Sequence, residues 1–469
     1  MAAGTEPRPL PDDVAQSLRH KVFQAQRDWR APSVVVRVVR RGQVQLDAWA
    51  GAADLGSTGP GPTSGPLEPG PDVQYRMGSI TKTFTAALVL QARDDGLLDL
   101  DDRLDAHLQV PAHGEVTLRR MLCHLSGLQR EPVGEVWESL RGPDLDAMLA
   151  DLAVAEAVLS PQQRWHYSNL AYALLGQVAA TVRGTSWEQV LRERLLDPLG
   201  LTRTTTEPTA PVARGYFVDP YADRVLPEPL FPGYAFAPAA ELWTTSADLA
   251  RWAAFWAEPD ESVLKAATVA EMTHLHAMAD LQQWTLGWGL GLMLHRRGER
   301  FFVGHDGAMP GFLASMVVHR DSSLGVVALT STSRAADPLT LAVELAEAVL
   351  DAVPELPQPW LPGPSVPADV EGLLGTWWTE GMEFAASWRS GDDHEVDGND
   401  GAHLELQAAG APASRPPARL RRDGSDRWRV VSGREQGELL RVVRGEDGVP
   451  TRLYWATYPM TRLPLPFGS

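Results

Sequence analysis

The spacing of apolar positions predicts several regular elements in the first quarter of the chain. Residues 12 to 29 carry apolar side chains at helical intervals and are expected to form an amphipathic helix. The stretch 32 to 51 places β-branched runs on both sides of "RRGQ", which predicts a hairpin. A further helix should begin close to Ser79, run through "TFTAALVLQARDDG" and stop near Gly96. From there to about residue 260 the pattern is mostly helical, with loops at "PQQRWHYSN" and "FPGYAFAPAA".

Strand patterns return after this helical stretch. The segments "WTLGWGLGLMLHR", "RFFVGHDG", "ASMVVHRD" and "LGVVALTS" are rich in apolar and β-branched residues, and a helix is expected at about 337 to 352. Strands therefore come early and late, with helices between them. This order predicts one α/β sheet that carries an inserted helical lobe.

The last hundred residues have a different character. A proline-rich stretch at 354 to 370 is typical of a linker, and the Gly/Pro-rich stretch at 56 to 72 of a loop. Short β patterns follow the linker and predict a small antiparallel barrel or sandwich. We therefore divide the chain into a catalytic α/β domain at 1–354, a linker at 355–368 and an all-β domain at 369–469.

Composition narrows the class of protein. The 469 residues are 44% hydrophobic and 22% charged, as in ordinary globular proteins. A net charge of −18 argues against nucleic acid or an anionic membrane as a partner. The N-terminal residues have no basic-then-apolar export pattern, no apolar run is long enough to span a bilayer, and the single cysteine excludes an internal disulfide. These features lead us to expect a cytoplasmic protein.

Two candidate sites carry little weight. Cys123 precedes His124, which invites a Cys–His catalytic interpretation, but a small buried thiol is the better explanation. "HLH" at 274–276 suggests metal ligands, yet neither H-E-x-x-H nor a spaced Cys/His cluster accompanies it. There is no Gly-rich phosphate loop. We therefore expect neither a metal nor a cofactor.

The strongest chemistry lies at Ser79 and Lys82, an S-x-x-K pair at the start of a helix. A spacing of three places both side chains on one helix face, and the helix N-terminus favours negative charge at the serine oxygen. The chain has only three lysines, whereas every other basic side chain is arginine. A buried amine can lose its proton near neutral pH and a guanidinium cannot, so this lysine is a candidate base.

Two further segments can complete such a site. In "WHYSNLAY", the phenol of Tyr167 can be held partly ionised near a lysine ammonium and can shuttle protons, although Tyr167 can equally be a packed tyrosine with Asn169 as a helix cap. In "FFVGHDGAMPGF", His305 and the residues after it end a strand whose edge can pair with a peptide-like ligand. The backbone N–H groups of Ala308 and Ser79 are candidates for an oxyanion hole.

The order Ser-x-x-Lys, Tyr-x-Asn, His-x-Gly resembles the serine β-lactamase and penicillin-binding-protein superfamily. "VTLRRMLCHLSGL", "LDPLGLTRT", "ELWTTSADLARW" and "GHDGAMPGF" are similar to further family landmarks, so the resemblance covers about residues 12 to 352. Tyr-x-Asn indicates the branch of class C β-lactamases, D-aminopeptidases and esterases. The implied fold is an antiparallel sheet flanked by helices with a helical lobe, followed here by a lipocalin-like all-β domain.

The resemblance also implies roles for the motif residues. Ser79 is acylated, Lys82 and Tyr167 take and return its proton, and Asn169 orients Lys82 and the substrate amide. His305 stands where relatives carry Lys or His, and the N–H groups of Ser79 and Ala308 form the oxyanion hole. Asp306 and Gly307 are substrate-binding candidates. Asp306 departs from the family pattern: an acid there should disfavour a substrate carboxylate, which argues against penicillin as a substrate.

The motifs do not show what resolves the acyl-serine. An appended lipocalin-like domain without an export signal resembles the penicillin-binding-protein-type thioesterases, which release nonribosomal peptides with a D-configured C-terminal residue and close them head to tail. This resemblance implies a peptide or acyl thioester substrate and makes a peptidyl carrier protein a candidate partner. Trp165, Trp243, Trp284 and Trp288 flank the motifs, and a few of them in the cleft would favour a bulky apolar acyl group.

Other interpretations stay open at this point. Water can resolve the same acyl-enzyme in a cytoplasmic D-stereospecific aminopeptidase, an amidase or a carboxylesterase. A degenerate binding protein is a third interpretation, against which the intact serine, lysine and tyrosine argue. Arg462 near the chain end is a candidate donor to peptide carbonyls, with a surface arginine on the barrel as the alternative. The sequence does not indicate an oligomeric state.

Overall fold

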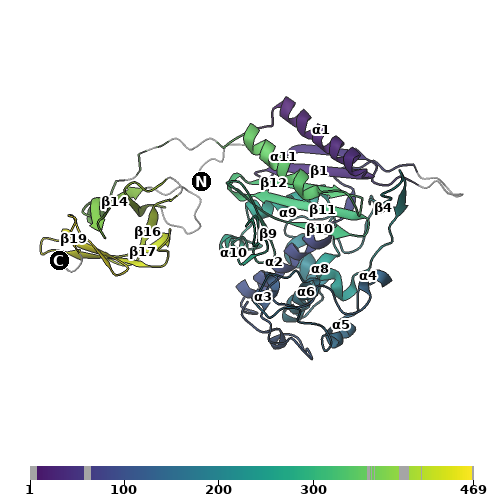
Figure 1. The fold of residues 1–469 in the computed structure, drawn as a ribbon, viewed down its shortest axis with the longest axis horizontal. Helices are drawn as coiled ribbons and strands as arrows, with labels where there is room; N and C mark the ends of the chain where they lie inside the picture. The colour runs from purple at the N-terminus through teal and green to yellow at the C-terminus, as the bar shows by residue number, and fades with distance from the viewer. Residues whose placement is uncertain are drawn as a thin grey trace. The chain divides into compact units, whose positions relative to one another are not determined.

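The computed structural model describes residues 8–56, 65–355, 360, 362–363, 365–389, 401–412 and 415–466. The chain divides into two compact units, one ending at Leu356 and the other beginning at Pro357 (Figure 1). The proline-rich segment expected at 355–368 and the Gly/Pro loop expected at 56–72 lie partly outside the described residues. No helix in the described ranges is long and apolar enough to cross a membrane.

The larger unit is built on one antiparallel sheet with the order β2-β1-β12-β11-β10-β9-β8-β7. The N-terminal hairpin joins the late strands because β1 pairs with β12, from Val34 opposite Thr330 to Arg40 opposite Leu324. This pairing confirms the single sheet expected from early and late strands. The strands are β1 (Ser33–Arg40), β2 (Gln43–Gly51), β7 (Ala277–Met278), β8 (Leu286–Trp288), β9 (Met293–Arg297), β10 (Arg300–Met309), β11 (Phe312–His319) and β12 (Leu324–Thr330).

Helices cover both faces of this sheet, which also confirms the expected architecture (Figure 1). On one face α1 and α11 pack over Val34, Val36 and Val326, and the other face supports the helical lobe. The helices are α1 (Asp12–Trp29), α2 (Thr81–Asp94), α3 (Leu118–Leu122), α4 (Val136–Ser139), α5 (Leu145–Asp151), α6 (Asn169–Arg183), α7 (Trp187–Leu191), α8 (Ala237–Ala240), α9 (Ser246–Ala257), α10 (Ala266–Met272) and α11 (Pro338–Ala352).

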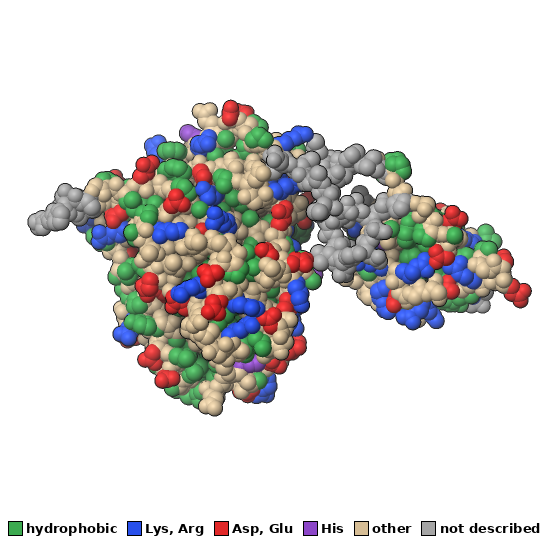
Figure 2. Space-filling view, turned by 180° about the vertical axis from the view of Figure 1, so that it is seen from behind, with side chains coloured by type: hydrophobic (Ala, Val, Ile, Leu, Met, Phe, Trp, Pro, Cys, Tyr) green, Lys and Arg blue, Asp and Glu red, His purple; other side chains and the backbone are tan. Residues whose placement is uncertain are grey.

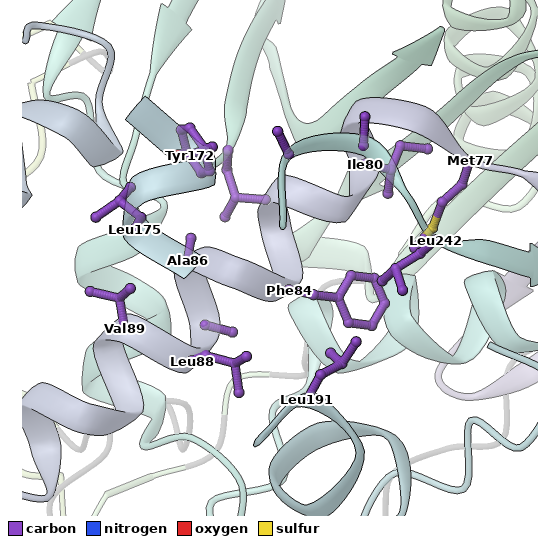
Figure 3. Close-up of a cluster of buried hydrophobic side chains, with 14 of the residues drawn as sticks. Met77, Ile80, Phe84, Ala86, Leu88, Val89, Tyr172, Leu175, Leu191 and Leu242 are labelled. Atoms are coloured by element: carbon purple, nitrogen blue, oxygen red, sulfur yellow. The ribbon is translucent and has the colours of Figure 1, made fainter. Parts of the chain in front are cut away.

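Helix α2 lies at the centre of the lobe and is buried on nearly every side, because its sequence is apolar or small around its whole circumference. Phe84 stacks on Trp252 with ring centroids 4.1 Å apart, and Figure 3 shows Leu88 and Tyr172 among the surrounding side chains. A short 3₁₀ turn, Gly78–Ile80, leads into the helix. The start of α2 is therefore held rigidly, and Ser79 lies on that turn.

The stretch expected to be mostly helical also contains short strands. β3 (Gln74–Arg76) pairs with β6 (Trp243–Thr245), and β4 (Tyr216–Val218) pairs with β5 (Val225–Pro227). Strands of three residues are too short to show an alternating pattern, so the sequence did not reveal them. The β3–β6 pair fixes the chain directly before the turn that carries Ser79.

The smaller unit is an eight-stranded antiparallel barrel in which each strand pairs with the next. A bridge between Trp378 and Thr461 brings the first strand to the last, so the barrel is nearly closed. Its interior is filled by apolar side chains, including Trp377, Trp428 and Leu453, which confirms a lipocalin-like all-β fold. The elements are α12 (Ala368–Glu371), β13 (Gly375–Thr379), β14 (Met382–Arg389), β15 (His403–Ala408), β16 (Ala418–Arg422), β17 (Arg427–Ser432), β18 (Leu439–Arg444), β19 (Pro450–Trp455) and β20 (Tyr458–Met460).

Candidate active site

Lys82 and Ser79 meet at the start of α2, as their spacing predicts. The Nζ atom of Lys82 lies 3.0 Å from the Oγ atom of Ser79 and donates a hydrogen bond to the carbonyl oxygen of Ala239 at 2.8 Å. Lys82 has no exposed surface, and this burial lowers its pKa well below the usual lysine value, with Glu131 opposing the shift. The side chain is therefore poised as a neutral amine that can accept the serine proton.

Tyr167 lies against the same pair. The Nζ atom of Lys82 lies 4.9 Å from the centre of its ring, and the Ser79 hydroxyl interacts with its phenol. The expectation of a partly ionised phenol is wrong: burial raises the pKa of Tyr167 above its usual value. An uncharged lysine offers no positive charge to hold a phenolate, so the phenol stays protonated and can act as a proton donor.

The backbone around Ser79 approaches β10 closely enough to form an oxyanion hole. Gly78 has a positive φ of 55°, and a Cβ atom there would lie 2.6 Å from the backbone nitrogen of Ala308. A Cβ atom at Gly307 would lie 3.3 Å from the nitrogen of Ser79 and 1.8 Å from the oxygen of Met77. Both positions require glycine, and their absent side chains allow the N–H groups of Ser79 and Ala308 to converge.

Asn169 differs from the role that the family resemblance implied. Its Nδ2 group donates to both carboxylate oxygens of Glu131, at 2.8 and 3.0 Å, and Lys82 is held by Ala239 instead. The Oδ1 atom of Asn169 is buried without a hydrogen-bond partner. Glu131 was missed because nothing in "LQREP" distinguishes it, yet its charge also acts on Lys82. Asn169 therefore presents an acceptor to the site, and its donor is occupied.

His305 and Asp306 lie on the part of β10 that pairs with a strand on one side only. β9 pairs with β10 only as far as Gly304, so His305–Met309 has β11 on one side and an open edge on the other. His305 is buried, and its pKa falls to about 3 because burial disfavours the imidazolium. Burial raises the pKa of Asp306 to about 6, although Ser315 donates a hydrogen bond to its carboxylate at 2.7 Å.

A cleft of about 990 Å³ opens over these residues. Ser79, Tyr167, Asn169, His305, Asp306, Gly307 and Ala308 all line it, so the predicted residues of the catalytic unit come together at one place. Aromatic side chains form much of its apolar wall. Trp165 and Trp288 line it, and so does Trp137, which the sequence analysis did not single out. Trp243 instead packs in the core against Phe312, and Trp284 is exposed.

His124 supports Tyr167 from behind. Its Nδ1 atom accepts a hydrogen bond from the backbone N–H of Ser168 at 3.0 Å, which leaves the ring proton on Nε2. The imidazole stacks on the ring of Tyr167 with centroids 4.3 Å apart, and burial keeps its pKa far below the usual value. The adjacent Cys123 is a buried thiol whose pKa rises to about 11, and its Sγ contacts the carbonyl oxygen of Arg119. Cys123 is therefore a small buried thiol, as the sequence analysis favoured, and not a catalytic cysteine.

Arg462 has a structural role in the barrel. Its guanidinium donates to the carbonyl oxygens of Gly372, Leu374 and Thr376 and lies 3.8 Å from the centre of the Trp377 ring. These contacts match the alternative of an arginine that belongs to the barrel, and a role in substrate binding stays a prediction. The residues that the structure describes hold no group of three or more His, Cys, Asp or Glu side chains arranged for a metal.

Comparison with known proteins agrees with this geometry. The family described as Beta-lactamase matches residues 18–350, and a Domain of unknown function (DUF7586) matches residues 366–462. Penicillin-binding protein 4 of Amycolatopsis lactamdurans is 30% identical over 66% of this chain and 86% of its own length.

Solved structures extend the likeness to the smaller unit. SurE is 26% identical, covering 96% of this chain and 99% of its own, with a TM-score of 0.59. A second SurE structure contains D-Leu, at 25% identity, 97% and 100% coverage and a TM-score of 0.57. A D-stereospecific amidohydrolase from Streptomyces sp. has the same fold, at 24% identity over 73% of this chain and 98% of its own, with a TM-score of 0.59.

Proposed function

Because the chain belongs to the β-lactamase and penicillin-binding-protein superfamily of serine hydrolases, we propose that it releases thioester-bound peptides by closing them head to tail. The acyl group would end in a D-configured apolar residue. The observation that carries the acyl-enzyme chemistry is the contact of 3.0 Å between the buried amine of Lys82 and the hydroxyl of Ser79. The identity of the donor and the acceptor is the proposed part.

The first half-reaction follows from the arrangement of Ser79, Lys82 and Tyr167. The Ser79 hydroxyl attacks the thioester carbonyl while its proton passes to the Nζ atom of Lys82. The N–H groups of Ser79 and Ala308 stabilise the negative charge that develops on the carbonyl oxygen. The C–S bond then breaks, the thiol leaves with a proton returned through Lys82 or Tyr167, and an ester to Ser79 remains.

The second half-reaction uses the same groups in reverse. The peptide's N-terminal amine attacks the ester, its surplus proton passes to Lys82 directly or by relay through the Tyr167 hydroxyl, and Lys82 returns that proton to the Ser79 oxygen, which leaves as the free hydroxyl. A cleft of about 990 Å³ gives room for the acyl end and the amine end together. Its aromatic wall, with Trp137, Trp165 and Trp288, favours an apolar acyl group and keeps water scarce around the ester.

The charges in the cleft support an amine rather than an anionic ligand. Glu131, Glu228, Asp306 and Asp337 line it, whereas Arg130 is the arginine among the lining residues. Carboxylates attract an amine-bearing segment and repel a substrate carboxylate, such as the one that penicillin carries. The likeness to SurE over both units, in one case with D-Leu bound, supports a D-configured acyl residue. A cytoplasmic location stays a prediction.

A D-stereospecific amidase, aminopeptidase or carboxylesterase is the second candidate. It is favoured by His305, whose Nε2 atom is buried without a partner and whose imidazole is neutral, so that it can bind a water molecule near the ester. In that case the acyl-serine would yield a linear acid. The two candidates share Ser79 and Lys82 and differ only in the acceptor.

The test uses a synthetic peptidyl thioester with C-terminal D-leucine and a free N-terminal amine. We expect a cyclic product by mass spectrometry, and an acyl adduct located at Ser79 when the N-terminus is acetylated. The L-leucine epimer and the Ser79→Ala variant are the matched controls, and both should give no product above background. Linear acid as the sole product, across several peptide lengths, would replace the cyclase by the hydrolase.

A further inference from the structure

The barrel concentrates arginine on four consecutive strands. The strands β16, β17, β18 and β19 together contain eight arginines and no acidic residue. Alternate positions on these strands, such as Leu420, Trp428 and Leu453, fill the barrel interior. The period of two therefore directs the intervening side chains to the outside. Six arginines share this outer surface, which we call the arginine face: Arg419, Arg421, Arg427, Arg429, Arg441 and Arg452.

The strand register places like charges opposite one another on this face. Arg421 lies directly opposite Arg429, and Arg427 lies directly opposite Arg441. Side chains at such positions are about 4.5 to 5.5 Å apart at Cβ, and like charges there destabilise a sheet. A fold that needed only stability would place acids or neutral residues at one member of each pair. The strand register therefore gathers these guanidinium groups on one surface.

Carboxylates contact Arg419, Arg427 and Arg429 on this face. Arg427 and Arg429 share a single partner, Asp423, at 3.3 and 2.7 Å, and Glu405 lies 3.7 Å from Arg419. The guanidinium of Arg441 lies 5.3 Å from the ring centre of Tyr454, which is a neutral partner. Figure 2 shows basic side chains gathered on the visible face of this unit. The face is thus positive on a chain whose net charge is −18.

We propose that the arginine face docks the acidic surface of the protein that carries the acyl group as a thioester. This inference rests on the proposed function, which requires a thioester donor. Guanidinium groups match carboxylates in bidentate pairs, so a patch rich in Asp and Glu is the complementary ligand. The arginine face lies in the part of the chain that matches a domain of unknown function.

A protein fits this face better than a nucleic acid or a membrane does. The net charge of −18 repels an extended polyanion, whereas a compact acidic surface meets only the local positive field. The face also includes Tyr454 and the exposed Val443, next to Arg441. Arginine and tyrosine beside apolar side chains are the composition of a protein–protein interface.

The test compares two donors of the same D-leucyl peptide. One is the thioester of N-acetylcysteamine, a small molecule, and the other is the phosphopantetheine thioester on a purified acidic carrier domain. We expect Arg427→Gln/Arg441→Gln to lower kcat/KM for the carrier-bound donor about tenfold, through KM, and to flatten its dependence on salt. The kcat/KM for the small thioester should stay within about twofold, because these residues are outside the catalytic unit.

A matched control distinguishes the loss of an arginine on the arginine face from the loss of a positive charge elsewhere on the barrel. Arg434 lies in the connection between β17 and β18, is 89% exposed and is not part of the face. Arg434→Gln removes one charge, as the single variant Arg441→Gln does, and should leave both donors unaffected. If the double variant weakens the barrel, the single variant Arg441→Gln still gives the result, since Arg441 contacts the neutral ring of Tyr454.

The remaining outcomes contradict either the docking surface or the proposed function. If both donors lose activity equally, or if Arg434→Gln acts like the double variant, the arginine face is not the docking surface. Tighter binding of the full-length protein to an oligonucleotide, or to vesicles containing phosphatidylglycerol, than to the carrier domain would also overturn it. If the wild-type protein turns over neither donor, the proposed function fails instead, independently of the face.

Discussion

The catalytic unit and the barrel each depend on a basic residue type, and they treat its charge in opposite ways. In the cleft, Lys82 has no exposed surface, and burial lowers its pKa well below the usual lysine value. On the barrel, Arg427 and Arg441 are exposed and keep their charge, even though the strand register sets them opposite each other. In the catalytic unit, burial removes the charge of Lys82 and makes it a base. On the barrel, the exposed arginines keep a positive surface.

The difference shows why position 82 is a lysine in a chain that has only three lysines. A lysine can lose its proton in a dry site, whereas arginine stays charged in any protein environment. The chain has three lysines, at positions 21, 82 and 265, and Lys82 is the fully buried one. Lys21 pairs with Glu344 at the surface, where an arginine would serve equally well. The comparison predicts that exchange of the two residue types is damaging only where their chemistry is used.

Lys82→Arg is the exchange with the largest expected effect. A guanidinium cannot accept the Ser79 proton, so turnover should fall by about 10³-fold or more, close to the loss in Ser79→Ala. The wild-type rate should rise with pH through the lowered pKa of Lys82, because the neutral amine is the active form, and the variant should lack this inflection. Stopped-flow acylation between pH 5 and 9 measures both.

Lys82→Met controls for folding, since it fills the site without a charge. Circular dichroism should show a native spectrum for Lys82→Met and the same loss of activity. A Lys82→Arg enzyme that retains most of its rate would show that deprotonation of residue 82 is not needed. That result would contradict the statement that position 82 needs a side chain that can lose its proton.

Tyr167→Phe tests the second proton carrier. The raised pKa of Tyr167 keeps its phenol protonated, so its loss removes a donor to the leaving group and a partner of Ser79. We expect a decrease of about 10² to 10⁴ in kcat with little change in KM. Donors whose leaving thiol has a lower pKa need less protonation and should be affected less. Equal losses for all leaving groups would assign Tyr167 a packing role.

Much of the catalytic unit could be predicted because its signals are local. The S-x-x-K spacing needs only a helix to bring Ser79 and Lys82 together, and α2 is apolar enough to be recognised. The glycine at 307 indicates a close backbone approach, which the structure places next to the nitrogen of Ser79. The order of strands and helices also indicates the sheet, although the three-residue strands β3 and β6 carry no pattern.

The rest depends on contacts between distant segments. Glu131 occupies the amide of Asn169 and influences Lys82, but no motif connects it to either residue. The state of the Tyr167 phenol depends on how deeply it is buried, which a sequence does not show. The cross-strand arginine pairs depend on register, and a shift by one residue would turn these side chains inward.

His124 should have a smaller effect than the groups that carry protons. His124→Leu loses the acceptor for the Ser168 N–H and the stacking on Tyr167, so the phenol is less well placed. We expect kcat to fall about tenfold to a hundredfold with an unchanged KM. In His124→Asn an amide oxygen can replace Nδ1 as the acceptor, and this variant should recover most of the loss.

The neighbouring Cys123→Ala serves as the control for His124. Its thiol contacts a carbonyl oxygen of its own helix and lies outside the hydrogen bond to Ser168, so activity should be retained. If His124→Leu and His124→Asn lowered kcat equally while both kept the wild-type melting temperature, the bond to Ser168 would not position Tyr167. Loss of activity in Cys123→Ala would reopen a role for the thiol.

Arg462→Lys reverses the exchange made at position 82 and should have the smallest effect. The planar guanidinium of Arg462 lies over Trp377 and donates to the carbonyl oxygens of Gly372, Leu374 and Thr376, a geometry that an ammonium cannot reproduce. The barrel should lose about 1 to 2 kcal/mol of stability, measured by denaturant unfolding of the full chain. Turnover of a small thioester should stay unchanged, because lysine at this position alters the barrel and leaves the base at position 82 intact. A loss of that turnover at full folding would instead give Arg462 a direct role at the substrate.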